Sequence, residues 1–185
     1  MDTTKSQVAR AALDAGASII NDVSGLRLDP AMAGLAAERQ VGLVLMHSRG
    51  EAGALASDQH PGYRDGVVPT VLGELAEAIE RARKAGVEAD RIVVDPGLGF
   101  GKSAEQSIEL LAGLGSLRRL GRPILIGPSR KRFLGVLTGR PVEERDIATA
   151  AACALGWEAG ARLFRVHEPG VTRDALAVAQ AVRPR

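Results

Sequence analysis

Short apolar runs recur along this chain, and each is followed by a polar or glycine-containing turn and then by a longer segment with helical periodicity. The runs are SIIND at 18–22, VGLVLMHS at 41–48, RIVVDPG at 91–97, PILIGPSRK at 123–131 and RLFRVHE at 162–168. Their hydrophobicity is continuous rather than alternating, which is typical of strands buried on both faces of a parallel sheet. Five successive βα units predict an α/β fold.

The segments between these runs carry helix start and stop signals. Residues 3–16 run from a threonine to Gly16, and a second helix is expected behind Asp29 as N-cap and Pro30 as first helical residue. Further helices are predicted at about 67–86, 103–121, 142–160 and 171–182. No linker or shift in composition interrupts the alternation, so residues 1–185 are expected to form one domain. The longest piece without periodicity, 49–63, is expected to be a ligand-facing or mobile loop.

Two architectures fit this alternation: an open doubly wound sheet and a (β/α)8 barrel. Polar residues stand at the carboxyl end of every expected strand, which is where barrel enzymes build their active sites, and this favours the barrel. These residues are Asn21, Asp22, His47, Asp95, Ser129, Arg130, Lys131, Arg165 and His167. Eight units need ~250 residues, whereas this chain of 185 holds five complete ones, so part of the barrel is expected to be missing.

Composition narrows the possible partners. The net charge is only +2 and aromatic residues make up 3% of the chain, so no basic surface with interleaved aromatics is indicated and nucleic acid is not an expected partner. No run approaches the ~20 apolar residues of a membrane span. The single cysteine, Cys153, lies in an apolar helix pattern, which predicts a buried thiol. These features indicate a soluble cytoplasmic protein.

The stretch DPGLGFGKS, residues 95–103, resembles a nucleotide-binding loop but fails the spacing tests. A P-loop requires glycine at position 96, which is Pro96, and a dinucleotide fingerprint requires glycine where Lys102 stands. The glycines therefore predict a tight turn after a strand, followed by a helix with Ser103 and Gln106 as a capping box. Asp95 is its candidate functional residue, whereas Lys102 is expected to be a solvated lysine at the helix start.

The other strand-end residues suit recognition of a polar heterocycle and of an anion. Asp95 and Asn21 could pair with the donors and acceptors of a flat ring, since a carboxylate can accept two parallel N–H groups. Arg165 and His167 alternate with Val166, so in a strand both would face the same side and suit a phosphate or pyrophosphate. A strand-end aspartate is a helix cap or turn residue about half the time, because Asp favours both positions. His60, which is followed by Pro61 and Gly62 in a loop, is expected to be a surface residue.

The ordered motifs resemble those of the dihydropteroate synthase family over essentially the whole chain. They are DTTKSQVARAALDAGASIINDVSGL, LVLMHSRG, IVVDPGLGFGKS, ILIGPSRKRFLG and LFRVHE. The resemblance implies a (β/α)8 TIM barrel, represented here from the end of strand 3 through strand 8 and its helix. It implies an enzyme that joins 6-hydroxymethyl-7,8-dihydropterin pyrophosphate to p-aminobenzoate and releases pyrophosphate, with Mg²⁺ as cofactor and a homodimer as the full-length assembly.

The resemblance also implies roles for individual residues. Those expected to bind substrates are Asp2, Asn21 and Asp95 on the pterin, Met46 and Gly127 lining its slot, Phe100 beside p-aminobenzoate, Lys131 between the two, and Arg165 and His167 on the pyrophosphate. Lys131, Arg165 and His167 are the expected catalytic residues. The asparagine that the family links to the metal has no counterpart in this chain, so no metal ligand is expected within it.

This chain departs from the family pattern in several places. The two first strands of the family's barrel are absent, and Met1 stands where the family usually has valine. We therefore expect that Met1 is a valine codon read as a start, and that the 185-residue chain alone lacks synthase activity. Smaller departures are EQSIELL at 105–111, Glu168 after the histidine, and Arg132 where many members have serine.

Three other functions fit some of these residues. The chain could be a non-catalytic pterin-binding remnant, which would bind pterin without releasing pyrophosphate. It could be a pterin-binding barrel of the corrinoid methyltransferase type, although that family is not expected to combine the SRK and RVH motifs. It could also be an aldolase that uses Lys131 as a Schiff base, which borohydride trapping would detect.

Overall fold

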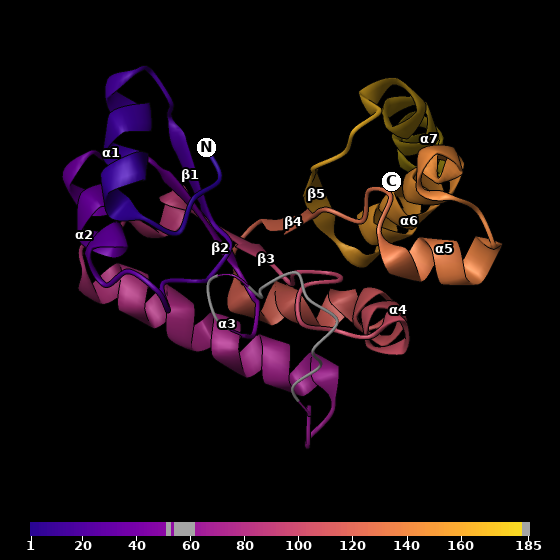
Figure 1. The fold of residues 1–185 in the computed structure, drawn as a ribbon, viewed down its shortest axis with the longest axis horizontal. Helices are drawn as coiled ribbons and strands as arrows, with labels where there is room; N and C mark the ends of the chain where they lie inside the picture. Colours follow the sequence, from indigo (N-terminus) through magenta and orange to yellow (C-terminus); the bar gives the residue numbers. More distant parts are fainter. Residues whose placement is uncertain (51–52, 54–61, 183–185) are drawn as a thin grey trace.

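The computed structural model describes residues 1–50, 53 and 62–182, and within them each strand is followed by at least one helix (Figure 1). The strands are β1 (Ile19–Asp22), β2 (Gly42–Met46), β3 (Ile92–Asp95), β4 (Ile124–Ile126) and β5 (Ala161–Phe164). The first four lie inside the predicted apolar runs and β5 begins one residue before the last run, so the predicted strands are confirmed.

The helices follow the predicted pattern with two differences. They are α1 (Ser6–Asp14), α2 (Ala31–Glu38), α3 (Val67–Lys84), α4 (Ala104–Ala112), α5 (Arg132–Thr138), α6 (Asp146–Ala159) and α7 (Pro169–Val182). The short α5 was not predicted, and the helix expected over 103–121 changes at Gly113 into a 3₁₀ segment, Leu114–Leu120. The predicted capping box is confirmed, because Gln106 N donates to Ser103 Oγ and Ser103 N donates to Gln106 Oε1. Asp29 also caps as expected, since its Oδ1 accepts from Ala31 N at 2.9 Å.

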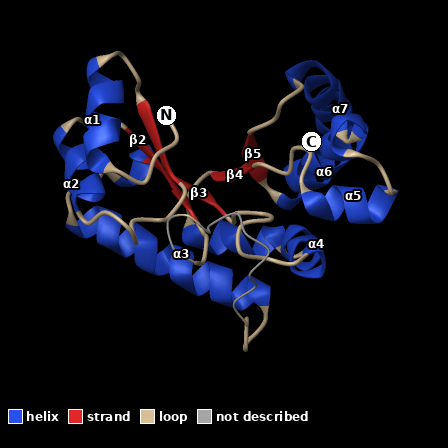
Figure 2. Cartoon of the chain, in the orientation of Figure 1, coloured by secondary structure: helices blue, strands red, loops and turns tan. Residues whose placement is uncertain are grey.

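All five strands are parallel, and each pairs with the next in sequence, in the order β1-β2-β3-β4-β5. A doubly wound sheet would reverse direction at a switch point, so this order excludes it and matches consecutive strands of a barrel wall. Figure 2 shows the helices on the outer side of the curved sheet. The structure therefore contains a five-strand arc of the predicted barrel.

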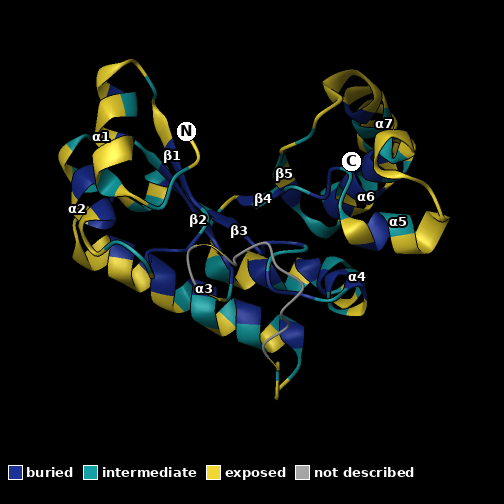
Figure 3. Ribbon diagram, in the orientation of Figure 1, coloured by how far each residue is buried: buried dark blue, intermediate teal, exposed yellow. Residues whose placement is uncertain are grey.

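The hydrophobic core lies between the sheet and these helices. The strand residues that face the helices are almost fully buried: Ile20, Leu43, Leu45, Ile92, Val94, Ile124, Ile126 and Ala161 are each at most 2% exposed (Figure 3). Because side chains alternate along a strand, their neighbours point to the inner side of the arc. One continuous cluster of buried apolar residues extends from Ala9 to Ala161. Cys153 is fully buried, as predicted, and burial raises the pKa of its thiol to about 12.

Two features bear on the remaining sequence predictions. Among the described residues, no helix is long and apolar enough to cross a membrane. Most of the expected 49–63 loop, together with His60, lies outside the residues that the structure describes.

Candidate functional site

Strand register places three of the predicted pterin residues on the inner side of the arc. Asn21 pairs with Val44, and Met46 pairs with Asp95. Paired residues of neighbouring strands point to the same face, and Val44 and Met46, two apart, also share a face. Asn21, Met46 and Asp95 therefore converge on one side of the sheet. Asp2 joins them through an isolated parallel bridge to Asn21.

Asn21 presents an acceptor to this inner side. Its amide nitrogen donates to Asp2 Oδ1 at 3.1 Å, which fixes the orientation of the side chain. Its Oδ1 is buried, and no donor among the described residues reaches it. A buried acceptor without a partner is costly in a folded protein, so this atom is suited to an N–H group of a ligand.

Asp95 is the second inward acceptor, and it is 5% exposed. Its Oδ1 accepts from Gly97 N at 2.7 Å, whereas no described residue donates to its Oδ2. Burial raises the pKa of this carboxyl, and the positive charges of Lys131 and Lys102 oppose that rise. The cations thus favour the carboxylate, the form that can accept two N–H groups from a ring.

Lys131 and Phe100 contact each other, and the charge of Lys131 acts on Asp95. The Lys131 ammonium donates to the carbonyl of Leu98 and stands 4.4 Å from the centre of the Phe100 ring. Burial lowers the pKa of Lys131 to about 8, although the negative charge of Asp95 acts in the opposite direction. The structure thus brings a cation, an aromatic face and a carboxylate to one point on the rim.

Arg165 and His167 lie at the same rim but not within a strand. β5 ends at Phe164, so the prediction that both residues belong to a strand is wrong. Arg165 pairs with Asp2 Oδ2 at 2.5 Å, and His167 Nδ1 lies 2.7 Å from the hydroxyl of Ser129. The side chain of Arg165 remains 63% exposed and can therefore reach a ligand from its present position. Gly127 lies beside Arg165, whose carbonyl oxygen would be 3.6 Å from a Cβ at Gly127.

The prediction that Lys102 is solvated is wrong. The residue is 3% exposed, and its ammonium lies inside the turn that follows β3. It donates to Gly97 O at 2.9 Å and to Phe100 O at 3.0 Å, and it contacts His47 Nδ1 at 2.9 Å. Helix-start position alone suggested an exposed lysine, but the glycine turn curls around the side chain and supplies acceptors for it.

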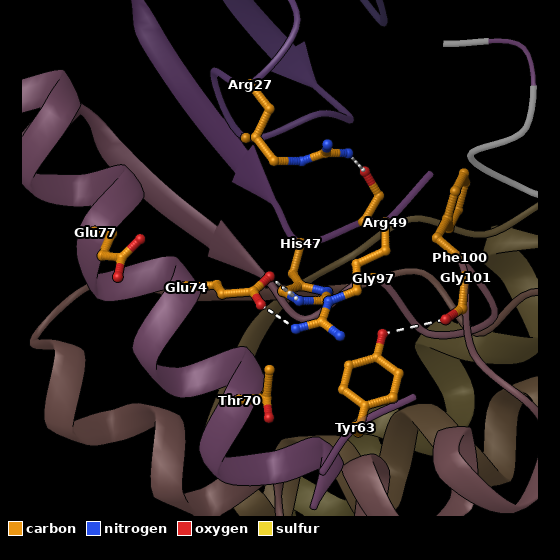
Figure 4. A network of polar contacts seen from close by, with 12 residues as sticks. Arg27, His47, Arg49, Tyr63, Thr70, Glu74, Glu77, Gly97, Phe100 and Gly101 are labelled. Carbon is orange, nitrogen blue, oxygen red and sulfur yellow. Dashed lines mark hydrogen bonds and ion pairs between the residues drawn. The ribbon is translucent and has the colours of Figure 1, made fainter. Parts of the chain in front are cut away.

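A polar network continues from His47 to helix α3 (Figure 4). Glu74 Oε2 lies 2.9 Å from His47 Nε2, at an angle that falls short of a well-formed hydrogen bond, and Glu74 Oε1 pairs with Arg49. The Arg49 guanidinium stacks 4.5 Å from the centre of the Tyr63 ring, and Tyr63 donates to Gly101 O at 3.1 Å. Sequence reasoning missed Glu74, because it occupies an ordinary polar position in a helix pattern.

We expect His47 to make the protein sensitive to mild acid. Burial lowers its pKa from 6.5 to about 4, so the unfolded chain binds a proton more readily than the folded one between these values. The contribution of neutral His47 to the free energy of unfolding is therefore fully present above about pH 6.5 and is lost as the pH falls towards 4. The loss is about 2 kcal/mol between pH 7 and pH 5. Urea unfolding at pH 7 and pH 5 measures this difference in the free energy of unfolding. In His47→Asn, which lacks the imidazole, the difference should be smaller by about 2 kcal/mol. An equal fall in the variant would contradict this account.

Most of this chain matches the model of a known protein family. The model of the family described as pterin binding enzyme matches residues 1–167, which include every candidate residue of the rim. The chain belongs to the pterin-binding enzyme family. Its membership agrees with the two inward acceptors at Asn21 and Asp95, the groups expected to face a pterin.

Dihydropteroate synthases are among the relatives of this chain. The synthase of Mycobacterium leprae is 48% identical over 187 residues, which cover 98% of this chain and 65% of that protein. The solved synthase of Xanthomonas albilineans with 4-aminobenzoic acid is 45% identical, with a TM-score of 0.90 over 98% of this chain and 66% of that one. The synthase of Thermus thermophilus in complex with 6HMPPP is 41% identical, with a TM-score of 0.88 over 98% of this chain and 69% of that one.

These matches confirm the predicted barrel family, and they show how much of each related synthase this chain covers. The chain spans a little under two thirds of the length of the Mycobacterium leprae and Xanthomonas albilineans synthases. The fold of that portion is retained closely, as the TM-scores show. Activity, substrates and partners of a whole synthase are therefore matters of proposal for this chain.

Proposed function

We propose that this chain carries the pterin and pyrophosphate sites of a dihydropteroate synthase. The observation that supports this most directly is the pair of inward acceptors at neighbouring strand ends. Asn21 Oδ1 lacks a donor among the described residues, and Asp95 Oδ2 receives no hydrogen bond from them. A pterin ring presents adjacent N–H groups along one edge, and these two oxygens are suited to accept them.

The reaction breaks the bond between the pterin methylene carbon and the pyrophosphate oxygen. The amine of p-aminobenzoate then forms the new C–N bond and loses a proton, and pyrophosphate leaves with the electron pair of the broken bond. Positive charge develops on the pterin methylene as this bond lengthens, and the Asp95 carboxylate is placed to stabilise it. No covalent intermediate with the protein is required.

Arg165 and His167 serve the leaving group in this proposal. Arg165 is exposed at the rim and already holds a carboxylate, that of Asp2, in charge-assisted geometry. A guanidinium also binds phosphate oxygens, so a pyrophosphate can take that place. His167, whose Nδ1 contacts the Ser129 hydroxyl, adds a second donor through the N–H of its other ring nitrogen. Lys131 and Phe100, which contact each other, would border the side from which p-aminobenzoate approaches the pterin.

Mg²⁺ is proposed as a companion of the pyrophosphate rather than as an ion that this chain holds by itself. Within the residues that the structure describes, no three His, Cys, Asp or Glu side chains form a group that could bind a metal. Mg²⁺ prefers oxygen ligands and is commonly held in part by substrate phosphates, where it would neutralise their charge. No step described above depends on it.

The remaining proposals concern assembly and location. A second copy of the protein is the partner that best fits an apolar groove of about 680 Å³ between α4, α5 and α6. Leu137 and Leu155 line this groove and are 61% and 64% exposed, and exposed apolar surface of this kind is a feature of protein–protein contact sites. We place the protein in the cytoplasm, where a lone buried thiol such as Cys153 stays reduced.

Two measurements on the purified chain test the proposed function. Calorimetric titration with 6-hydroxymethyl-7,8-dihydropterin pyrophosphate should show saturable binding, and the absence of binding would contradict the proposal. Dihydropteroate formation should appear in a hybrid that adds the portion of the Xanthomonas albilineans synthase that this chain does not cover. Binding without product in the hybrid would instead indicate a non-catalytic pterin-binding protein.

A further inference from the structure

We propose that Lys102 is a positioning residue of the pterin site, which fastens the 95–101 turn to the end of β2 and so holds Asp95 in place. The inference rests on the proposed function, because it assigns a role to Asp95 in pterin binding. It adds a residue that lies outside the predicted binding groups and acts only through them.

The contacts of Lys102 join two separate segments of the chain. Its ammonium donates to Gly97 O and Phe100 O, at the two ends of the glycine turn. On the other side it contacts His47 Nδ1 at 2.9 Å and His47 O at 3.4 Å, just beyond the end of β2. An ammonium has three N–H donors, so these acceptors use its full capacity. Lys102 is thus occupied by the protein and has no donor to spare for a substrate.

The turn that Lys102 holds is directly coupled to the Asp95 carboxylate. Gly97 N donates to Asp95 Oδ1 at 2.7 Å, so a shift of Gly97 would move the carboxylate with it. The backbone of β3 is tied to the same place, because His47 N donates to Asp95 O at 2.8 Å. Phe100, whose carbonyl accepts from Lys102, carries the ring that stacks with Lys131. One ammonium therefore determines the position of both Asp95 and Phe100.

His47 transmits this anchor to helix α3. Since the ammonium form of Lys102 can only donate, His47 Nδ1 accepts from it. The ring hydrogen of His47 is then on Nε2, which faces Glu74 Oε2 at 2.9 Å. Figure 4 shows Glu74 reaching from α3 to both His47 and Arg49. A cavity of about 550 Å³ adjoins this network, lined by residues of α3 and of the β1–α2 and β2–α3 connections. The network lies between the sheet and α3, outside the inner face that is proposed to bind the pterin.

The energetics of Lys102 support a role beyond folding. Burying an ammonium disfavours its charged form, and burial lowers the pKa of Lys102 to about 7. Asp95 and Glu74 act against this shift, whereas Lys131 and Arg49 add to it. An apolar side chain of the same length would avoid the desolvation cost. We therefore infer that the charge of Lys102 keeps Asp95 ionised and that its N–H donors keep Asp95 in place, which offsets the cost of burying the ammonium.

Lys102→Met tests the proposal because methionine keeps the length of the side chain and removes the ammonium. We expect pterin affinity, measured by calorimetry, to fall at least tenfold, and the pH profile of binding to shift upward as Asp95 loses a neighbouring cation. Lys84→Met, the same change at an exposed lysine of α3, should leave both unchanged. Affinity within twofold of the unaltered chain in folded Lys102→Met would overturn the proposal.

Two substitutions of His47 provide a second test, which does not require Lys102→Met to fold. Asparagine can place its Oδ1 where His47 Nδ1 accepts from Lys102, whereas leucine offers no acceptor. We expect His47→Asn to bind pterin within threefold of the unaltered chain and His47→Leu to bind at least tenfold more weakly. Equal affinities in the two variants would overturn the proposal.

Hydrogen exchange without ligand separates this proposal from the proposed function. The Gly97 and Phe100 amides donate within the turn, to Asp95 Oδ1 and Gly97 O. In His47→Leu these amides should exchange at least tenfold faster than in His47→Asn. Unchanged exchange would contradict the role of Lys102, whereas failure of the unaltered chain to bind pterin would contradict the proposed function alone.

Discussion

Replacing Asp95 by asparagine is expected to weaken binding of the pterin substrate by at least 100-fold. The carboxylate can accept two parallel N–H groups, whereas an asparagine offers one acceptor and turns an N–H towards the second donor of the ring. One charge-assisted hydrogen bond is lost, and a buried N–H of the ring is left without an acceptor. Together these losses correspond to about 3 kcal/mol, or more than 100-fold in affinity. Calorimetric titration of both proteins with the pterin pyrophosphate measures the effect.

Asp90→Asn is the matched control for this change. Asp90 is exposed in the 3₁₀ segment Ala89–Arg91, and the same loss of charge there should leave pterin affinity unchanged. Thermal unfolding of both variants establishes that they are folded at the temperature of the titration. Equal affinities of the Asp95 and Asp90 variants would show that the inward carboxylate does not bind the ring.

Replacing Gly97 by alanine is expected to disrupt the same turn and to destabilise the fold by more than about 3 kcal/mol. Gly97 has φ +67°, a conformation that other residues rarely adopt, and an added Cβ would lie 1.9 Å from the carbonyl oxygen of His47. That oxygen belongs to the backbone, so neither side can yield without moving β2 or the turn. Pterin binding should be lost as well, because Gly97 N orients Asp95.

Gly121→Ala separates the contact from the backbone conformation. Gly121 has φ +62°, close to that of Gly97, but nothing lies within 4 Å of the place its Cβ would occupy. The strain of the left-handed conformation alone corresponds to about 1–2 kcal/mol. The free energies of unfolding of the two variants, measured in urea, should therefore differ by at least about 1–2 kcal/mol. Similar losses would contradict the close packing of the turn against β2.

The elements of the fold were predictable because their signals are local. Continuous apolar runs marked all five strands, and the Ser103 capping box placed the start of α4 at the correct residue. Polar residues at every strand end predicted a barrel, and a barrel implies that each strand pairs with the next in sequence. The observed strand order agrees with this. The helix α5 was missed because its seven residues are too few to display a periodicity.

The polar network behind the site was not predictable in the same way. Lys102 looked like an exposed residue because sequence position alone does not show that a glycine turn will enclose it. Glu74 looked like one of several charged residues on α3, and only the packing of α3 against the end of β2 brings it to His47. Contacts of this kind depend on the meeting of segments distant in sequence, for which the chain carries no periodic signal.

A crystal structure of the chain with 6-hydroxymethylpterin tests the central claim most directly. The account predicts the ring on the inner face of the sheet, with its N–H groups within hydrogen-bond distance of the Asp95 carboxylate and of Asn21 Oδ1. A pterin bound elsewhere, for example in the cavity beside α3, with Asp95 and Asn21 making no contact to it, would contradict the account.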